Sequence, residues 1–119
     1  MAAPNLKNPT TITGKTARYA VTASLANALA NSAASGKVLK INSIFCANVD
    51  GTNAADISVS IYDGTTDYYI ARTIAVPADA TQIISSKETY FYLEEGDSLR
   101  ATANAASGVV LIVGYEEIS

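Results

Sequence analysis

The chain has 119 residues and a net charge of −3, with eight Lys and Arg residues against eleven Asp and Glu residues. This length fits one domain with one core, and the 49% of hydrophobic residues is sufficient to fold it. The charge repels phosphate backbones, and a chain with no histidine and one cysteine lacks the commonest general base, the commonest zinc ligand and any internal disulfide. We therefore expect no nucleic-acid partner, no metal and no cofactor.

The first 15 residues have the pattern of an extended arm. They are mostly polar, contain Pro4 and Pro9, and show no hydrophobic period. They contain neither the basic region nor the apolar stretch of a signal peptide, and no apolar run in the chain approaches the length of a membrane span. We expect an arm over residues 1–15, a domain over residues 16–119, synthesis in a cytoplasm and no membrane partner.

Alternation of apolar and polar residues follows the arm. Tyr19, Val21 and Leu25 fall on odd positions, which predicts a strand with one buried face. The Ala-rich stretch 23–34 also suits a short helix, since Leu25 and Leu29 are four residues apart. We favour the strand, because the alternation begins before the alanines and helix caps are poor.

The clearest strand runs from Leu39 to Val49. Its odd positions, among them Ile41 and Phe45, are predicted to face the core, and even positions such as Lys40 and Asn48 to face solvent or an interface.

Two Asp-Gly segments follow, at residues 50–53 and 63–67, on either side of an alternating run from Ile57 to Ile61. Asp-Gly between alternating runs is typical of hairpin turns. Neither segment has the ligand spacing of an EF-hand, so we interpret both as turns and not as calcium loops.

Further short strands are predicted up to the end of the sequence. Their ranges are 68–76, which Pro77 ends, and 81–85, 89–93, 99–103 and 109–115. About eight short strands with frequent turns predict an all-β fold, a single-domain antiparallel β-sandwich of jelly-roll or immunoglobulin-like type. The run from Val109 to Val113 is apolar on both faces, so it is either a central strand or a contact with another subunit. Val110, Ile112 and Tyr115 are our candidates for a subunit interface.

The sequence contains few candidates for catalytic residues. Glu94, Glu95 and Asp97 lie beside Gly96 in a turn, and Glu116 and Glu117 lie near the end of the sequence, where water would keep them ionised. Cys46 lies in a predicted strand with no histidine to activate it. We expect no enzyme, and a hydrolase would require an activity that is lost on changing Glu94 or Asp97.

Five of the seven tyrosines flank predicted strands. Tyrosine suits both protein contacts and sugar binding, and it also suits the rim of a small core. The residues concerned are Tyr62, Tyr68, Tyr69, Tyr90 and Tyr92.

Several strand and turn segments resemble a family of small virion structural proteins of tailed bacteriophages, especially marine ones. The matching segments are Gly36–Ile44, Asn48–Val59, Ile74–Thr81, Tyr92–Ala101 and Gly114–Ile118. The resemblance implies a β-sandwich module that is repeated on a phage particle and made in the host bacterial cytoplasm. It supplies no catalytic residue.

The resemblance favours a capsid decoration (cement) protein, a homotrimer that binds the major capsid protein or other virion proteins and stabilises the assembled head. We expect the arm, from Ala2 to Thr13, to contact the capsid. The residues assigned to this contact are Pro4, Asn5, Leu6, Lys7 and Pro9. The alternatives are a neck, tail or fibre component and a carbohydrate-binding module that uses the tyrosines.

Overall fold

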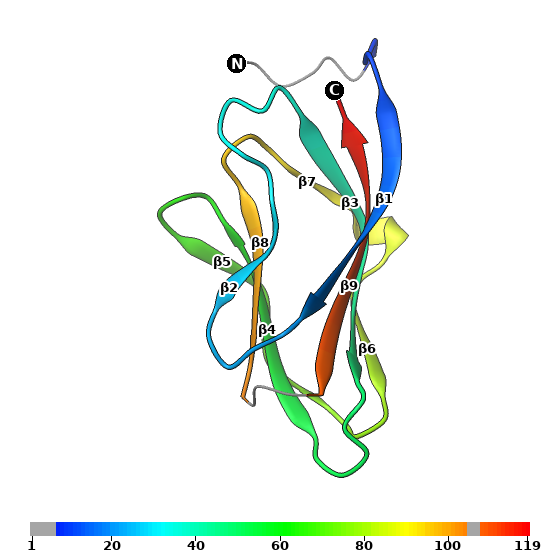
Figure 1. Ribbon diagram of the computed structural model, residues 1–119, viewed down its shortest axis with the longest axis vertical. Helices are drawn as coiled ribbons and strands as arrows, with labels where there is room; N and C mark the ends of the chain where they lie inside the picture. Colours follow the sequence, from blue (N-terminus) through cyan, green and yellow to red (C-terminus); the bar gives the residue numbers. More distant parts are fainter. Residues whose placement is uncertain (1–6, 105–107) are drawn as a thin grey trace.

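The computed structural model describes residues 7–104 and 108–119, which form two β-sheets packed face to face (Figure 1). Sheet A has the strand order β1-β9-β3-β6, with β7 also paired to β3, and sheet B has the order β2-β8-β4-β5. The strands are β1 (Ile12–Ala20), β2 (Ala26–Ala30), β3 (Val38–Asn48), β4 (Ala55–Tyr62), β5 (Asp67–Val76), β6 (Thr81–Ser85), β7 (Phe91–Leu93), β8 (Ser98–Ala103) and β9 (Val109–Ile118), and a 3₁₀ turn, η1 (Lys87–Thr89), precedes β7. The predicted all-β antiparallel sandwich is confirmed.

The pairing of the strands is nested. The first strand pairs with the last, β2 pairs with β8, β3 with β6 and β7, and β4 with β5, all antiparallel. Successive nested pairs alternate between the two sheets, which is the topology of a jelly roll. The structure therefore selects the jelly roll from the two sandwich types that the sequence allowed.

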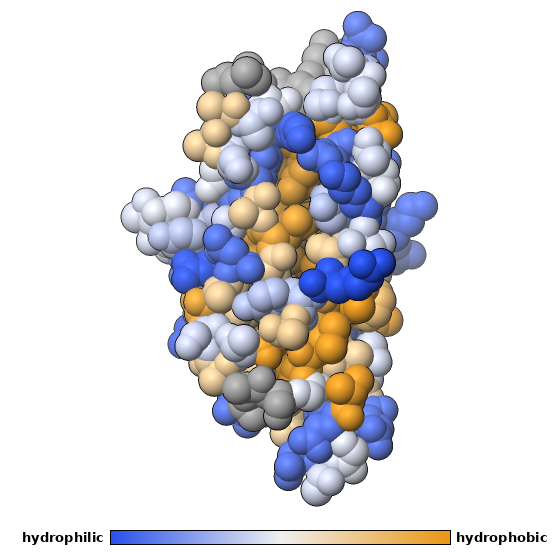
Figure 2. All heavy atoms as spheres, viewed as in Figure 1, coloured by the Kyte–Doolittle hydropathy of each residue, from blue (hydrophilic) through white to orange (hydrophobic). Residues whose placement is uncertain are grey.

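The core lies between the sheets and consists of aliphatic side chains from both. Along most strands alternate residues reach it, as expected for strands that each bury one face. The largest fully buried side chains are Ile41, Ile44, Ile57, Leu93, Leu99 and Leu111. Figure 2 shows hydrophobic residues along the middle of the molecule, where the two sheets meet.

A β-bulge in β3 reverses the predicted alternation. The register against β9 shifts between Ile41 and Ser43, so Ile41 and then Ile44 face the core. An extra residue in one strand moves every following side chain to the opposite face. Phe45 was therefore wrongly predicted to be in the core, and Asn48 was wrongly predicted to face outward, since its side chain is only 2% exposed.

The residues from 19 to 30 belong to two strands and not to one. The chain leaves sheet A at Val21, whose N–H donates to the Val109 carbonyl, and reaches sheet B at Thr22, whose carbonyl accepts from the Ala103 N–H. Strand β2 then occupies the middle of the Ala-rich stretch, so the preference for strand over helix is confirmed there. Leu29 packs against the core, which anchors this short strand.

The two Asp-Gly segments have different roles. The segment 63–67 is a hairpin turn between β4 and β5, with Gly64 in the left-handed region at φ 98°. The segment 50–53 connects β3 in sheet A to β4 in sheet B, so the hairpin predicted there is wrong. Asn48 supports this crossing, because its buried Nδ2 donates to the carbonyls of Asn53 and Val76 at 2.9 and 3.0 Å.

Candidate functional site

The aspartates at the start of the two Asp-Gly segments stabilise the turns through hydrogen bonds to backbone N–H groups. The Oδ1 atom of Asp50 accepts the N–H groups of Thr52 and Asn53, and that of Asp63 accepts those of Thr65 and Thr66. These hydrogen bonds favour the charged form and lower the pKa of both carboxyl groups. No group of three or more His, Cys, Asp and Glu residues that could hold a metal ion is found within residues 7–104 and 108–119.

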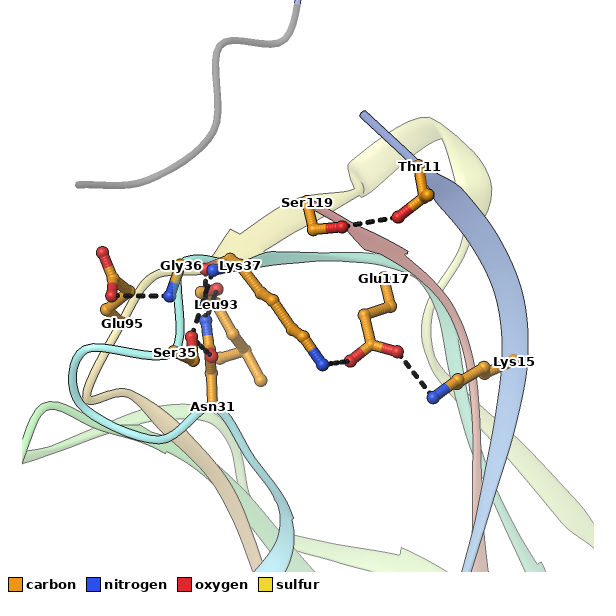
Figure 3. A network of polar contacts seen from close by, with 10 residues as sticks. All are labelled: Thr11, Lys15, Asn31, Ser35, Gly36, Lys37, Leu93, Glu95, Glu117 and Ser119. Carbon is orange, nitrogen blue, oxygen red and sulfur yellow. Dashed lines mark hydrogen bonds and ion pairs between the residues drawn. The ribbon is translucent and has the colours of Figure 1, made fainter. Parts of the chain in front are cut away.

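Three of the other acidic residues also make structural contacts. Glu95 accepts the N–H of Gly36 at 3.0 Å, and Asp97 accepts that of Glu94 at 3.1 Å. The two carboxylate oxygens of Glu117 form ion pairs with Lys15 and Lys37 (Figure 3). These carboxylates link loops and strands through hydrogen bonds and ion pairs.

Cys46 lies in the core on β3 and is fully buried. Burial raises the pKa of its thiol to about 12, so the thiol stays protonated at neutral pH. The described residues enclose no pocket in which a small substrate could bind. Within the same residues, no helix is long and apolar enough to cross a membrane.

The five tyrosines are divided between the two sheets. On sheet B, the Arg100 guanidinium lies 4.2 Å from the centre of the Tyr62 ring, and that of Arg72 lies 4.7 Å from the centre of the Tyr69 ring. At the other sheet, the rings of Tyr90 and Tyr92 meet edge to face at 6.0 Å. Tyr68 is 59% exposed on β5, the outermost strand of sheet B. The tyrosines therefore do not form one continuous platform.

An apolar band covers the outer face of sheet A. Cross-strand register places Ile83 beside Phe45, and Phe45 beside Ile112. The next row pairs Ala47 with Val110. Their neighbours along the strands, among them Ile44, Cys46, Ile84, Val109 and Leu111, belong to the core or pack against it, so these side chains face away from it. We call these five residues the outer band.

Most of the outer band is half-buried within its own sheet, but Ile83 is 65% exposed. Polar and aromatic side chains border the band. Arg18 on β1 is paired with Ile112, and Lys40 on β3 lies over the Tyr90 ring at 4.5 Å. An apolar patch with such a rim is typical of protein interaction surfaces.

The outer face of sheet B is polar. Its β8 and β4 strands contribute Arg100 and Ser60, which both contact Asp67 at 3.4 and 2.9 Å. Within the described residues the two outer faces therefore differ, because that of sheet B carries these polar groups and the Tyr62 and Tyr69 rings beside arginines, whereas that of sheet A carries the outer band.

Two of the three predicted interface residues lie in the outer band. Val110 and Ile112 face outward, whereas Tyr115 packs against the core. Phe45 and Ile83 were missed, because the bulge in β3 gives no signal in the hydrophobic pattern and because Ile83 sits in a short run with no clear alternation.

The predicted capsid-contacting residues fall partly outside the described residues. Pro4, Asn5 and Leu6 lie outside them, and Lys7 and Pro9 lie within them, ahead of β1. The arm was predicted to extend to residue 15, but β1 begins at Ile12. Just before it, the N–H groups of Thr10 and Thr11 donate to the Ser119 carbonyl.

Solved structures that resemble this fold include two of phage proteins. Both are crystal structures of a pentameric capsid protein isolated from metagenomic phage sequences, each 17% identical to this chain, with TM-scores of 0.45 and 0.42. Each match covers 87% of this chain and 61% of the solved one, so the chain spans about three fifths of the length of those proteins. Neither a protein-family model nor a curated protein matches the sequence.

Proposed function

We propose that this chain is a structural protein of a phage particle, a decoration protein that binds the assembled capsid and reinforces it. The observation that carries the proposal is the outer band. An antiparallel sheet presents Phe45, Ile83 and Ile112 on the side away from its own core, where Ile83 is 65% exposed and Phe45 and Ile112 are half-buried. Burial of such side chains against another protein is favourable.

Three further features support a structural role. The sequence segments named above resemble small virion proteins, the jelly roll is a fold found among viral capsid domains, and only 16% of the residues are charged. A weakly charged surface loses little hydration when another protein covers it. Fold alone does not determine function, so the jelly roll supports a structural role only together with the outer band.

The proposed mechanism is binding that is selective for the assembled shell. A ligand that binds one state of a particle and not its dissociated subunits stabilises that state by mass action, and many bound copies add their effects. In this proposal the outer band packs copies against one another in a homotrimer, and the arm before β1, including Lys7 and Pro9, contacts the major capsid protein.

The test uses particles from which the chain has been removed and purified chain that is added back. We expect the chain to sediment with the particles and to raise the temperature at which they release their genome. Ile83→Asp, at the most exposed position of the outer band, should weaken assembly and binding. Ile70→Asp is the matched control, since Ile70 is 36% exposed on β5 of the other sheet.

Two results would count against the proposal. Purified chain that stays in the supernatant would contradict binding to the shell. Equal effects of Ile83→Asp and Ile70→Asp would contradict the role of the outer band.

A further inference from the structure

Strand β1 is a long, regular strand at the edge of sheet A. It has nine residues, no proline, and pairs with β9 without any register shift. The other edge strands of the described chain are short or irregular. β2 has five residues and a register shift, β6 and β7 have five and three residues, and β5 has two shifts and a left-handed residue, Thr73 at φ 54°. Bulges and short lengths protect edge strands from further pairing.

Half of the backbone polar groups of β1 point away from β9. Thr11 and Ser119 exchange both of their N–H to carbonyl hydrogen bonds. Bonded and non-bonded pairs alternate in an antiparallel ladder, so the odd-numbered residues of β1 bond to β9 and the even-numbered ones direct their N–H and carbonyl groups to the open edge. These residues are Ile12, Gly14, Thr16, Arg18 and Ala20, and all five are exposed.

We propose that this edge pairs with β1 of a second copy of the chain, antiparallel across a two-fold axis, with Thr16 opposite Thr16. In this register, every residue of β1 that directs its backbone N–H and carbonyl groups to the open edge has a partner in the second copy. Gly14 lies opposite Arg18, and Ile12 lies opposite Ala20. Sheet A then continues from one copy into the next without a break.

The charges and the length of β1 together favour this register. Centring the pair on residue 15 would place Lys15 opposite Lys15, and centring it on residue 18 would place Arg18 opposite Arg18, both of which are unfavourable. Centring it on residue 17 leaves Ile12 without a partner. With Thr16 at the axis, Lys15 faces Ala17, and Glu117 already neutralises the Lys15 ammonium group.

The contact is separate from the outer band. Edge pairing joins two sheets side by side and leaves their outer faces uncovered, so copies that associate through the outer band can also be linked through β1. The inference rests on the β1 edge alone and does not depend on a role in a virion.

Engineered cysteines test the register directly. Opposed residues of a bonded antiparallel pair have Cα atoms about 5.5 Å apart, which is within disulfide range. The native Cys46 is buried and does not interfere. We expect Thr16→Cys to form a covalent dimer under mild oxidation by copper phenanthroline. Gly14→Cys and Arg18→Cys should each remain monomeric alone and should cross-link when mixed.

Thr81→Cys is the matched control, because Thr81 is an exposed threonine on β6 at the opposite edge of sheet A. Circular dichroism verifies that each variant is folded. Cross-linking of Thr16→Cys that is no faster than that of Thr81→Cys would overturn the proposal. So would cross-linking of Gly14→Cys alone that is as fast as that of the Gly14→Cys and Arg18→Cys mixture.

A charge exchange at the same position provides a second test without oxidation. Thr16→Lys and Thr16→Glu each place like charges at the axis, so each alone should shift the association measured by sedimentation velocity to at least several-fold higher concentration. An equimolar mixture of the two should restore association. A mixture that associates no better than either variant alone would contradict the two-fold arrangement.

Discussion

Lys15 on β1 and Glu117 on β9 form an ion pair of 2.5 Å, and Lys37 reaches the second carboxylate oxygen of Glu117 at 2.7 Å (Figure 3). Lys37 directly precedes β3, so one carboxylate links the three adjacent strands of sheet A near the end of β9. The two lysine side chains are 44% exposed, whereas that of Glu117 is only 19% exposed.

The Glu117 contacts predict a stability that depends on pH. Hydrogen bonds from both lysines lower the pKa of Glu117, so the contribution is present above the ordinary pKa of glutamate and is lost as the pH falls through the lower folded value. We expect Glu117→Gln to lower the free energy of unfolding by about 0.5–1 kcal/mol at neutral pH. Urea unfolding at neutral pH and below about pH 3 measures this, and an equal difference at both pH values would contradict the account.

The bulge in β3 predicts opposite sensitivities at two neighbouring positions. Ile44 is fully buried in the core, and Phe45 lies outside on the outer band. Ile44→Ala should cost about 2–5 kcal/mol in unfolding free energy. Phe45→Ala should cost clearly less, about 1 kcal/mol, because the aromatic side chain is not enclosed. A larger loss of unfolding free energy for Phe45→Ala than for Ile44→Ala would show that buried and exposed positions alternate through residues 42 and 43 without a bulge.

The buried thiol of Cys46 predicts slow modification. The side chain has no exposed surface, and its pKa of about 12 leaves almost no thiolate at neutral pH. We expect an aromatic disulfide reagent to react with the native protein only as fast as the fold opens and exposes the thiol. In denaturant the same reaction should finish within seconds. Rapid reaction of the native protein would contradict the burial of Cys46.

The start of β1 sets the limit for truncating the arm. Deletion of residues 2–9 leaves Thr10, Thr11 and their hydrogen bonds to Ser119, so the thermal unfolding midpoint should change little while particle binding is lost. Deletion of residues 2–13 also removes Ile12 and Thr13, which pair with β9, and should lower the midpoint. If the variant lacking residues 2–9 binds particles as well as the full chain does, the proposed contact between the arm and the capsid is contradicted.

Most strands could be predicted from alternation, because strands that each bury one face carry a period of two. The alternating run from Ile57 to Ile61 lies within β4, and β5 ends at Val76, just before Pro77, as predicted. The division of residues 19–30 between two sheets was missed, since the change of sheet at Val21 leaves the apolar pattern unbroken.

The candidate site was only partly predictable. Val110 and Ile112 could be found because β9 is apolar on both faces, which requires cover on both sides. Phe45 could not, because a bulge of one residue depends on pairing with β9 and not on residues 42 and 43 alone. The open edge of β1 also escaped prediction, since edge and central positions are properties of the whole sheet.

The most direct measurement of the proposed function is the number of copies of this chain per purified particle, obtained by quantitative mass spectrometry against the major capsid protein. A decoration protein predicts hundreds of copies in each particle. About a dozen copies would place the chain in a neck or tail and contradict decoration of the shell, and its absence from the particles would contradict a virion role altogether.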